Sequence, residues 1–182
     1  MEYIGDIHLG ETVMISDPSY RLDTWCQIPI NPKVTDNDMK MKPGRYSCYV
    51  KKVDAGDWGE RIAELLVFYH NKPEYINDSV SWQGLMGEVG VDGGLAGVYD
   101  YDYFTKYHSK KDINEEWYNQ FVYNSNRNVF INDNMFVTSS GFGDGGYDAA
   151  VKLIDDNTVV AIKVTFLWED DDEEDEEDEE ED

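Results

Sequence analysis

The sequence contains no long hydrophobic run, few cysteines and little positive charge, and each shortage excludes a class of protein. No stretch of about 18 apolar residues occurs, so we expect no transmembrane helix. The N-terminal residues show no basic segment followed by an apolar one, which argues against a secretory signal. The two cysteines, Cys26 and Cys48, are too few for a disulfide scaffold, and we expect both to be reduced in a cytoplasmic protein.

Motifs of the common enzyme classes are also missing. The histidines His8, His70 and His108 do not pair at the spacing of metal ligands, and the sequence has neither CxxC nor HExxH. It has no Walker A loop and no GxGxxG ahead of a helix, so we expect no phosphate cradle. Ser139 and Ser140 stand close to a glycine, but the GxSxG elbow of a serine hydrolase is absent. These absences favour a protein that is not an enzyme.

Negative charge is abundant and unevenly spread. The 182 residues include 39 Asp and Glu but only 15 Lys and Arg, a net charge of −24. The last 14 residues, 169–182, are all acidic, and without them the net charge is −10. Adjacent like charges repel each other and have nothing to bury, so we expect a disordered tail after a single β-rich domain at 1–168. Such an acidic chain does not neutralise phosphates, which argues against direct nucleic-acid binding and favours a basic protein partner.

A period of two marks several segments as strands. From Thr158 to Trp168 the even positions are all apolar, which predicts a half-buried strand. The alternation at 147–153 predicts a second strand, and the polar cluster at 155–157 predicts the turn of a β-hairpin. The same reasoning predicts further strands at 12–16, 45–53, 82–92 and 135–138, with 61–70 either a strand or a short helix.

One segment has the pattern of a helix. Ile113, Trp117 and Phe121 fall on one helical face, and Asp112 precedes them in the position of a capping residue. We therefore expect a helix from Asp112 to about Asn124 that packs on a sheet. Together with 25 aromatic residues, these patterns predict a mainly β (α+β) fold, an antiparallel β-sandwich or open barrel with one packed helix.

Two short segments, 84–97 and 141–146, contain ten of the 15 glycines, and each also contains an aspartate, Asp92 or Asp144. Glycine is favoured where φ is positive or where another group approaches the backbone closely. One interpretation is tight β-connections and bulges, with the aspartates in Asx-turns. The other is that the two loops meet and present Asp92 and Asp144 to a ligand or cation.

Asp17 ends the first predicted strand in the sequence SDPSY and also has two interpretations. It either caps a turn fixed by Pro18 or joins Asp92 and Asp144 in a site of hard oxygen ligands for Mg²⁺, Mn²⁺ or Ca²⁺. No EF-hand spacing occurs, so calcium is not specifically indicated. The predicted ligand-binding residues are Asp17, Tyr20, Asp92, Gly93, Gly94, Gly143, Asp144 and Gly145, and the predicted metal ligands are Asp17, Asp92 and Asp144.

Four segments in a fixed order resemble a known family. They are SDPSY at 16–20, VGVDGGLAGVYD at 89–100, SSGFGDGGYD at 139–148 and VVAIKVTF at 159–166. Over 12–166 the chain is similar to a family of bacterial and phage proteins, domain of unknown function 4241. The resemblance implies a bacterial or phage cytoplasmic protein in which Asp17, Asp92 and Asp144 matter together. It implies no catalytic residue, because no activity is established for that family, and the acidic tail is not part of the pattern.

Two functions from different classes fit these observations. The first is a non-enzymatic acidic interaction protein that binds or inhibits a basic partner, such as a nucleic-acid-binding protein. The second is a β domain that binds a small ligand or a divalent cation, including a metal-dependent hydrolase that uses Asp17, Asp92 and Asp144. The charge and the missing catalytic motifs favour the first. An internal role for the tail also stays open, in which it folds back on the basic residues at 40–52 or 106–111 and masks them.

Overall fold

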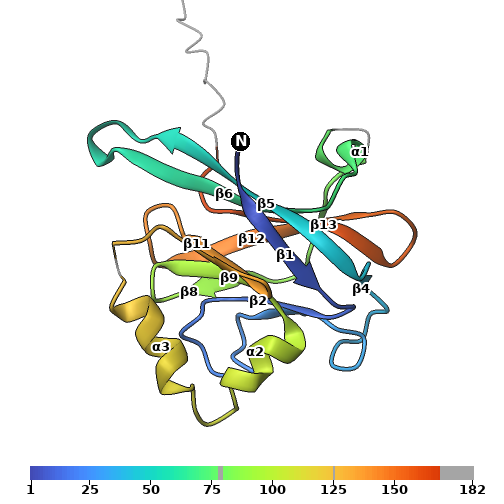
Figure 1. Cartoon of the computed structure of the whole chain (residues 1–182), viewed down its shortest axis with the longest axis horizontal. Coiled ribbons are helices and arrows are strands. Elements are labelled where there is room, and N and C mark those ends of the chain that lie inside the picture. The colour runs from blue at the N-terminus through green and yellow to red at the C-terminus, as the bar shows by residue number, and fades with distance from the viewer. Residues whose placement is uncertain (78–79, 125, 169–182) are drawn as a thin grey trace, which may run out of the picture.

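The chain folds into two β-sheets that pack face to face, as Figure 1 shows for the computed structural model. The structure describes residues 1–77, 80–124 and 126–168, so the predicted acidic tail at 169–182 lies outside the described residues. Within those three ranges, no helix combines the length and the apolar character needed to cross a bilayer.

The larger sheet has eight strands. They are β1 (Glu2–Leu9), β4 (Lys40–Met41), β5 (Gly44–Asp54), β6 (Glu60–Tyr69), β7 (Gln83–Gly84), β8 (Val89–Val91), β12 (Gly145–Leu153) and β13 (Thr158–Thr165). They pair in the order β1-β5-β6-β13-β12-β7, with β4 beside β13 and β8 beside β12. The pairs are antiparallel except for the short β4–β13 pair. The hairpin predicted at 147–168 is therefore present as β12 and β13.

The smaller sheet has five strands, all antiparallel to their neighbours, in the order β10-β11-β9-β2-β3. They are β2 (Val13–Ser16), β3 (Ile28–Ile30), β9 (Leu95–Asp100), β10 (Val129–Asn132) and β11 (Met135–Ser139). The helices of the described residues are α1 (Pro73–Ile76), α2 (Tyr101–Tyr107), α3 (Glu115–Val122) and a 3-10 turn, η1 (Gly56–Trp58).

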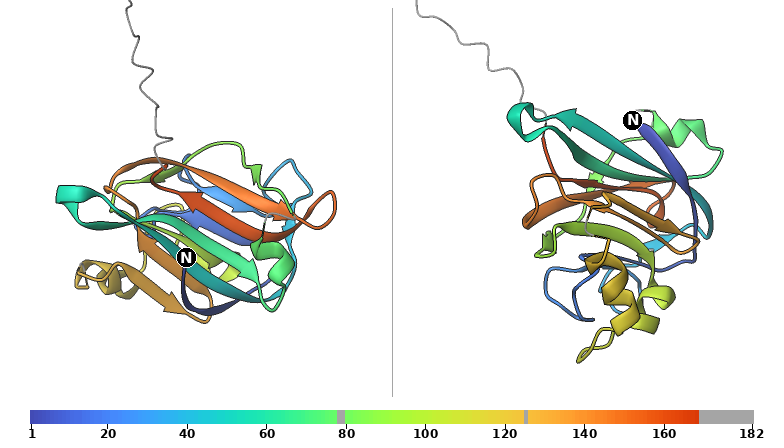
Figure 2. Two further views of the ribbon diagram at one scale, coloured as in Figure 1. Left: turned by 90° about the horizontal axis from the view of Figure 1, so that it is seen from above. Right: turned by 60° about the vertical axis from the view of Figure 1, so that its left-hand side comes forward.

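Three hydrophobic clusters join these elements in layers. The largest lies between the two sheets and includes Tyr46 and Phe136, both fully buried. The second packs α2 and α3 on the outer face of the smaller sheet, through Phe104 and Trp117. The third lies on the outer face of the larger sheet and includes Tyr75 of α1. Figure 2 shows the same layers from two further sides. The fold is mainly β and sandwich-like, as predicted, and is not a closed barrel.

The prediction that the last strand is half-buried is wrong, and the place of β13 in the sheet explains why. β13 lies between β6 and β12, and apolar clusters cover both of its faces. Ala161 packs in the outer cluster and Ile162 in the inner one, and both are fully buried. Alternation in sequence reports one apolar face and does not reveal a second covered face. The ambiguous segment 61–70 is a strand, β6, and β1 was missed.

The predicted helix is present as α3, but it begins later than expected. Its N-cap is Asn114, whose side-chain oxygen accepts a hydrogen bond from Trp117 N (3.1 Å), and not Asp112. Ile113 lies before the helix, in a β-bridge with His108, whereas Trp117 is buried as predicted. Helices α1 and α2 were not predicted from the sequence.

We predict that Gly97→Ala destabilises the sandwich. A Cβ at position 97 of β9 would lie 2.6 Å from Val137 Cγ2 and 2.9 Å from Phe136 O in the neighbouring strand. Because a strand backbone cannot yield as a flexible side chain does, we expect the free energy of unfolding to fall by about 2 kcal/mol. Urea denaturation measures it, with Gly84→Ala in β7 as control, since nothing lies within 4 Å of that Cβ position. Equal stability of the two variants would contradict the prediction.

Candidate functional site

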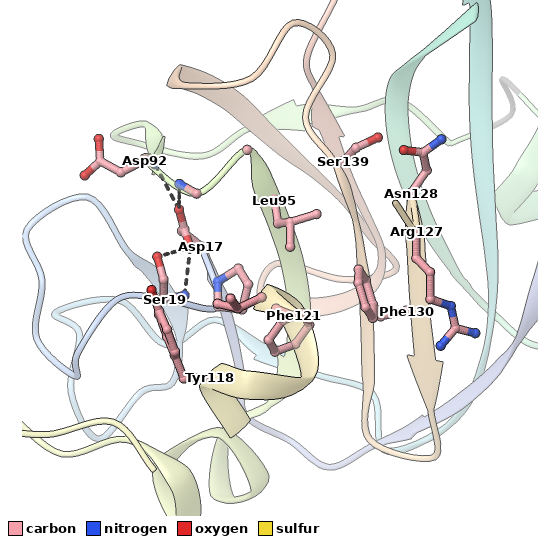
Figure 3. Close-up of a pocket in the computed structure, with 14 residues that line it drawn as sticks. Asp17, Ser19, Asp92, Leu95, Tyr118, Phe121, Arg127, Asn128, Phe130 and Ser139 are labelled. Atoms are coloured by element: carbon pink, nitrogen blue, oxygen red, sulfur yellow. Dashed lines mark hydrogen bonds between the residues drawn. The ribbon is translucent and has the colours of Figure 1, made fainter. Parts of the chain in front are cut away.

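The candidate site is built around Asp17, a fully buried aspartate directly after β2. Its Oδ1 accepts hydrogen bonds from Ser19 N (2.7 Å) and Ser19 Oγ (2.6 Å), which closes the turn in SDPSY. Its Oδ2 accepts from Asp92 N (2.9 Å) and Gly93 N (2.7 Å) in the connection from β8 to β9, as Figure 3 shows. Asp17 therefore caps a turn, as one interpretation predicted, and also ties together two segments far apart in sequence.

The turn after Asp17 is held from its other side by the helices. Pro18 O accepts a hydrogen bond from Trp117 Nε1 of α3 (2.9 Å) and lies 3.0 Å from Nε2 of His108, which follows α2. The other ring nitrogen of His108, Nδ1, lies 2.8 Å from Phe104 O, and the two rings stack with centroids 3.8 Å apart. The position of the turn is thus fixed by both the strand and the helices.

A cleft of about 550 Å³ lies between this turn, α3 and the smaller sheet. Its apolar lining includes Leu95, Phe121 and Phe130, and its polar lining includes Arg127 and Ser139. In Figure 3 the first three converge on the interior of the cleft. A mostly apolar pocket of this size with a few polar groups is typical of a site for a small ligand or for an apolar side chain of a partner.

A second hollow, of about 270 Å³, shares Asp92 with the cleft. Tyr20 OH donates a hydrogen bond to Asp92 Oδ2 (2.8 Å), and burial together with this bond raises the pKa of Tyr20, so the phenol stays protonated. Trp25 is 89% exposed, and the carboxylate of Glu88 lies against Gly146, where a Cβ would overlap it. The hollow thus combines two aromatic rings with two carboxylates, and none of its lining residues in the described ranges is basic.

The two glycine-rich segments meet, but as paired strands and not as two open loops. β8 runs antiparallel to the start of β12, with Gly145 opposite Val91 and Gly146 opposite Gly90. A Cβ at Gly90 would lie 2.6 Å from the Cβ of Cys26, so a side chain at position 90 would exclude the segment that precedes β3. The glycines therefore permit close approach, as the first interpretation predicted, and the two segments meet and build one wall of the hollow. Presentation of Asp92 and Asp144 to a ligand or cation stays a prediction.

The remaining predicted ligand-binding residues divide between the site and a turn. Gly93 and Gly94 line the cleft, whereas Gly143 and Asp144 line neither the cleft nor the hollow. Gly143 O accepts hydrogen bonds from the Tyr147 hydroxyl (2.5 Å) and from a serine hydroxyl of the same loop (2.8 Å). Asp144 follows it as an exposed residue. This part of the loop is organised by its own turn.

The described residues give no support to the predicted divalent-cation site at Asp17, Asp92 and Asp144. Within 1–77, 80–124 and 126–168, no group of three or more His, Cys, Asp or Glu is arranged to hold a metal ion. Asp17 uses both carboxylate oxygens for hydrogen-bond donors of the chain, and Asp144 lies outside both pockets that Asp92 lines. A hard cation needs several carboxylate or carbonyl oxygens directed at one point.

Most side chains that give the two pockets their chemical character were not predicted from the sequence. Trp25 lies in a loop for which no element was predicted. Glu88 lies in the connection between β7 and β8, within the segment 82–92 that was predicted to be one strand. Phe121 was predicted to pack on a sheet, which it does, but its second role in the cleft depends on where α3 crosses the sheet. Arg127 and Phe130 follow α3 in a segment for which no element was predicted.

Comparisons with known proteins assign no family to this geometry. No family model matches the chain, and neither a curated protein nor a solved structure matches it. The similarity to domain of unknown function 4241 therefore stays a prediction from the sequence. Any functional assignment has to be argued from the site itself.

We predict that Asp17→Ala lowers the free energy of unfolding by about 3 kcal/mol, because it removes a buried acceptor and leaves its donors without a partner. Hydrogen exchange of the Asp92 and Gly93 amides should accelerate more than exchange in the core strands. Urea denaturation and exchange measured by NMR test both expectations. Asp144→Ala, at an exposed position, is the matched control. Unchanged exchange of the two amides in Asp17→Ala would show that Asp17 does not hold the loop.

We predict that His108 makes the fold less stable as pH falls through about 6.5, the ordinary histidine pKa. Burial lowers the pKa of His108, and the carbonyls of Pro18 and Phe104 oppose this shift only in part. The unfolded chain then takes up a proton before the folded one, so the histidine's contribution is complete above pH 6.5 and declines below it. We expect the difference in unfolding free energy between the natural chain and His108→Asn to shrink from pH 7.5 to pH 5.5. A difference that is constant or grows would contradict it.

Proposed function

We propose that this chain is a non-enzymatic interaction protein that binds a basic protein partner. A basic side chain of the partner enters the hollow of Tyr20, Trp25, Glu88 and Asp92, and a neighbouring apolar side chain enters the cleft. The observation that carries the proposal is that a pocket with three apolar side chains and a pocket with two carboxylates share one wall, Asp92. A segment that places a cation beside an apolar group can fill both.

The chemistry of the hollow suits a lysine or arginine side chain. A cation there meets the carboxylates of Glu88 and Asp92 and the faces or edges of two aromatic rings. At about 270 Å³ the hollow is smaller than the usual site for a drug-sized ligand, which suits one inserted side chain. Its walls belong to paired strands and hydrogen-bonded turns, so little ordering is needed on binding.

The charge of the whole chain supports the same class of partner. A net charge of −24 attracts a basic surface over distances of about a Debye length and accelerates encounter. A surface that otherwise binds nucleic acid is basic in the same way, so occupation by this chain would inhibit nucleic-acid binding by the partner. A bacterial or phage cytoplasmic protein, as the family resemblance implies, is part of this proposal.

Several basic residues at 40–52 and 106–111 already pair with acidic side chains of the described residues. Lys40 pairs with Glu11 (3.9 Å), and Lys110 pairs with Asp23 (2.9 Å). Lys52 lies 2.9 Å from a carboxylate oxygen of β1, and Arg45 pairs with an aspartate of the same strand. Because much of the positive charge at 40–52 and 106–111 is already paired, this arrangement favours an external partner over internal masking.

A second candidate function is the binding of a small apolar ligand in the cleft alone. The specific observation in its favour is the volume of about 550 Å³, which lies in the range of small-molecule sites. In this alternative the hollow and the charge of the chain would play no part in recognition.

We predict that a short synthetic peptide with an adjacent Arg-Leu pair binds, and that the matched Glu-Leu peptide does not. NMR titration at low salt should shift the Trp25 indole and the amides of Gly145 and Gly146, which line the hollow. Glu88→Gln should weaken the affinity about tenfold, because it removes one charged hydrogen-bonding partner of the guanidinium. Higher salt should weaken the binding further.

The matched control is Asp156→Asn, which removes the same charge in the β12–β13 turn. This turn follows the C-terminal end of β12, whereas Gly145 begins the strand. Its affinity for the Arg-Leu peptide should equal that of the natural chain. Equal binding of the Arg-Leu and Glu-Leu peptides, with shifts confined to cleft residues such as Leu95, would overturn the proposal in favour of the small-ligand alternative. An equal loss of affinity in Glu88→Gln and Asp156→Asn would show that only the net charge of the chain attracts the peptide, and would overturn the hollow as its binding site.

A further inference from the structure

Two exposed aromatic rings from distant segments meet on the surface and line neither the cleft nor the hollow of Tyr20, Trp25, Glu88 and Asp92. Trp58 ends η1 at the tip of the β5–β6 hairpin, which projects beyond the rest of the larger sheet in Figure 2, and Phe142 lies in the loop between β11 and β12. The rings pack edge to face with centroids 6.3 Å apart, yet Trp58 stays 69% exposed and Phe142 60% exposed. With Arg61 and Gly141 they line a hollow of about 420 Å³. Exposed aromatic rings that pack on each other are typical of interaction surfaces.

Both rings are presented by ordered turns. At the hairpin tip, Trp58 N donates to Ala55 O (3.2 Å) and Ala55 N donates to Gly59 O (3.0 Å). In the other loop, Gly143 N donates to Ser140 O (2.8 Å), directly beside Phe142. The surface is therefore formed before any partner arrives, which lowers the entropic cost of binding.

The charge around the rings is predominantly negative. Asp54, Asp57 and Glu60 are exposed within four residues of Trp58, where Arg61 is the basic residue, and Glu60 also pairs with Lys52 (3.3 Å). Leu167, near the end of the described residues, lies against the same loop. A Cβ at Gly141 would lie 3.0 Å from the side chain of Leu167, and the 14 acidic residues follow two positions later in the chain. Leu167, which packs against the loop of Phe142, is therefore followed in sequence by the most negative part of the chain.

We propose that Trp58 and Phe142 form a second contact surface for the basic partner and bind an arginine-rich segment of it. This inference rests on the proposed function and names the chemistry of the partner. The planar guanidinium of arginine stacks on aromatic rings and pairs with carboxylates at the same time, which the compact, strongly hydrated ammonium of lysine does less well. The 14 acidic residues at 169–182 add to the net negative charge that attracts a cationic segment over long range.

The charge also argues against the other occupants that an exposed aromatic surface commonly has. A second copy of this chain carries the same net charge of −24 and would be repelled. Anionic membrane surfaces would be repelled for the same reason. A cationic protein segment is the occupant whose charge is complementary to this surface.

The experiment is isothermal titration calorimetry of the full chain with decaarginine and decalysine. We expect decaarginine to bind more tightly, and the variant with both Trp58→Ala and Phe142→Ala to lose about tenfold in affinity for decaarginine together with its preference over decalysine. Tyr123→Ala is the matched control, since Tyr123 is 81% exposed and lines none of the pockets named here. A full-length variant in which residues 169–182 are replaced by their amides should bind both peptides more weakly and with less salt dependence.

The outcomes separate this inference from the proposed function. Equal affinities of the natural chain and the double variant for decaarginine, with Glu88→Gln weakened, would overturn the aromatic surface and leave the hollow of Tyr20, Trp25, Glu88 and Asp92 as the contact. Absence of binding of either peptide at low salt would overturn both. Thermal melting of each variant excludes a loss through misfolding, which exposed positions such as Trp58 and Phe142 should not cause.

Discussion

One buried anion, the carboxylate of Asp17, holds the site together. Burying a charge is costly unless hydrogen bonds compensate for the lost water, and here four donors from two segments do so. The connection to which Asp17 is hydrogen-bonded runs from β8 of the larger sheet to β9 of the smaller one. The aspartate therefore fixes the chain at the point where it crosses between the sheets, and the two pockets lie on either side of this crossing.

The shared wall gives the two pockets a common mechanical support. Asp92 donates its backbone N–H to Asp17 and accepts a hydrogen bond from Tyr20 through its side chain. The backbone bond sets the edge of the apolar cleft, and the side-chain bond orients a carboxylate toward the acidic hollow. Any displacement of this residue alters the apolar and the acidic pocket together, so one residue sets the spacing between the two pockets.

The sequence predicted the fold class because the relevant signals are local. The period of two at 45–53 correctly predicted β5, in which Tyr46, Cys48 and Val50 are buried between the sheets. It failed for β13, because the second face is covered by α1 and by Val80 and Trp82 after it, which no period in β13 itself can report. The cap of α3 was misplaced by two residues because Asp112 and Asn114 are both good capping residues, and the β-bridge at Ile113 decides between them.

The site was partly predictable for a similar reason. The pattern of glycine and aspartate brought Asp17, Asp92 and Gly93 together correctly, because each residue type has a narrow structural use. The chemistry inferred for them was different from what the structure supports, since the same carboxylate can bind a metal or backbone amides. Trp25, Glu88 and Phe121 join the site through topology, and the order of strands in the two sheets is not encoded in any short pattern.

Strand β12 has a consequence for how recognition could change during evolution. Its first residues, at Gly145 and Gly146, form a wall of the acidic hollow, and the same strand continues into the middle of the larger sheet beside β13. Substitutions at these two glycines therefore affect the stability of the sheet as well as the binding surface. New specificities would more readily arise at Trp25 and Glu88, which lie on connections and can vary while the framework behind them is conserved.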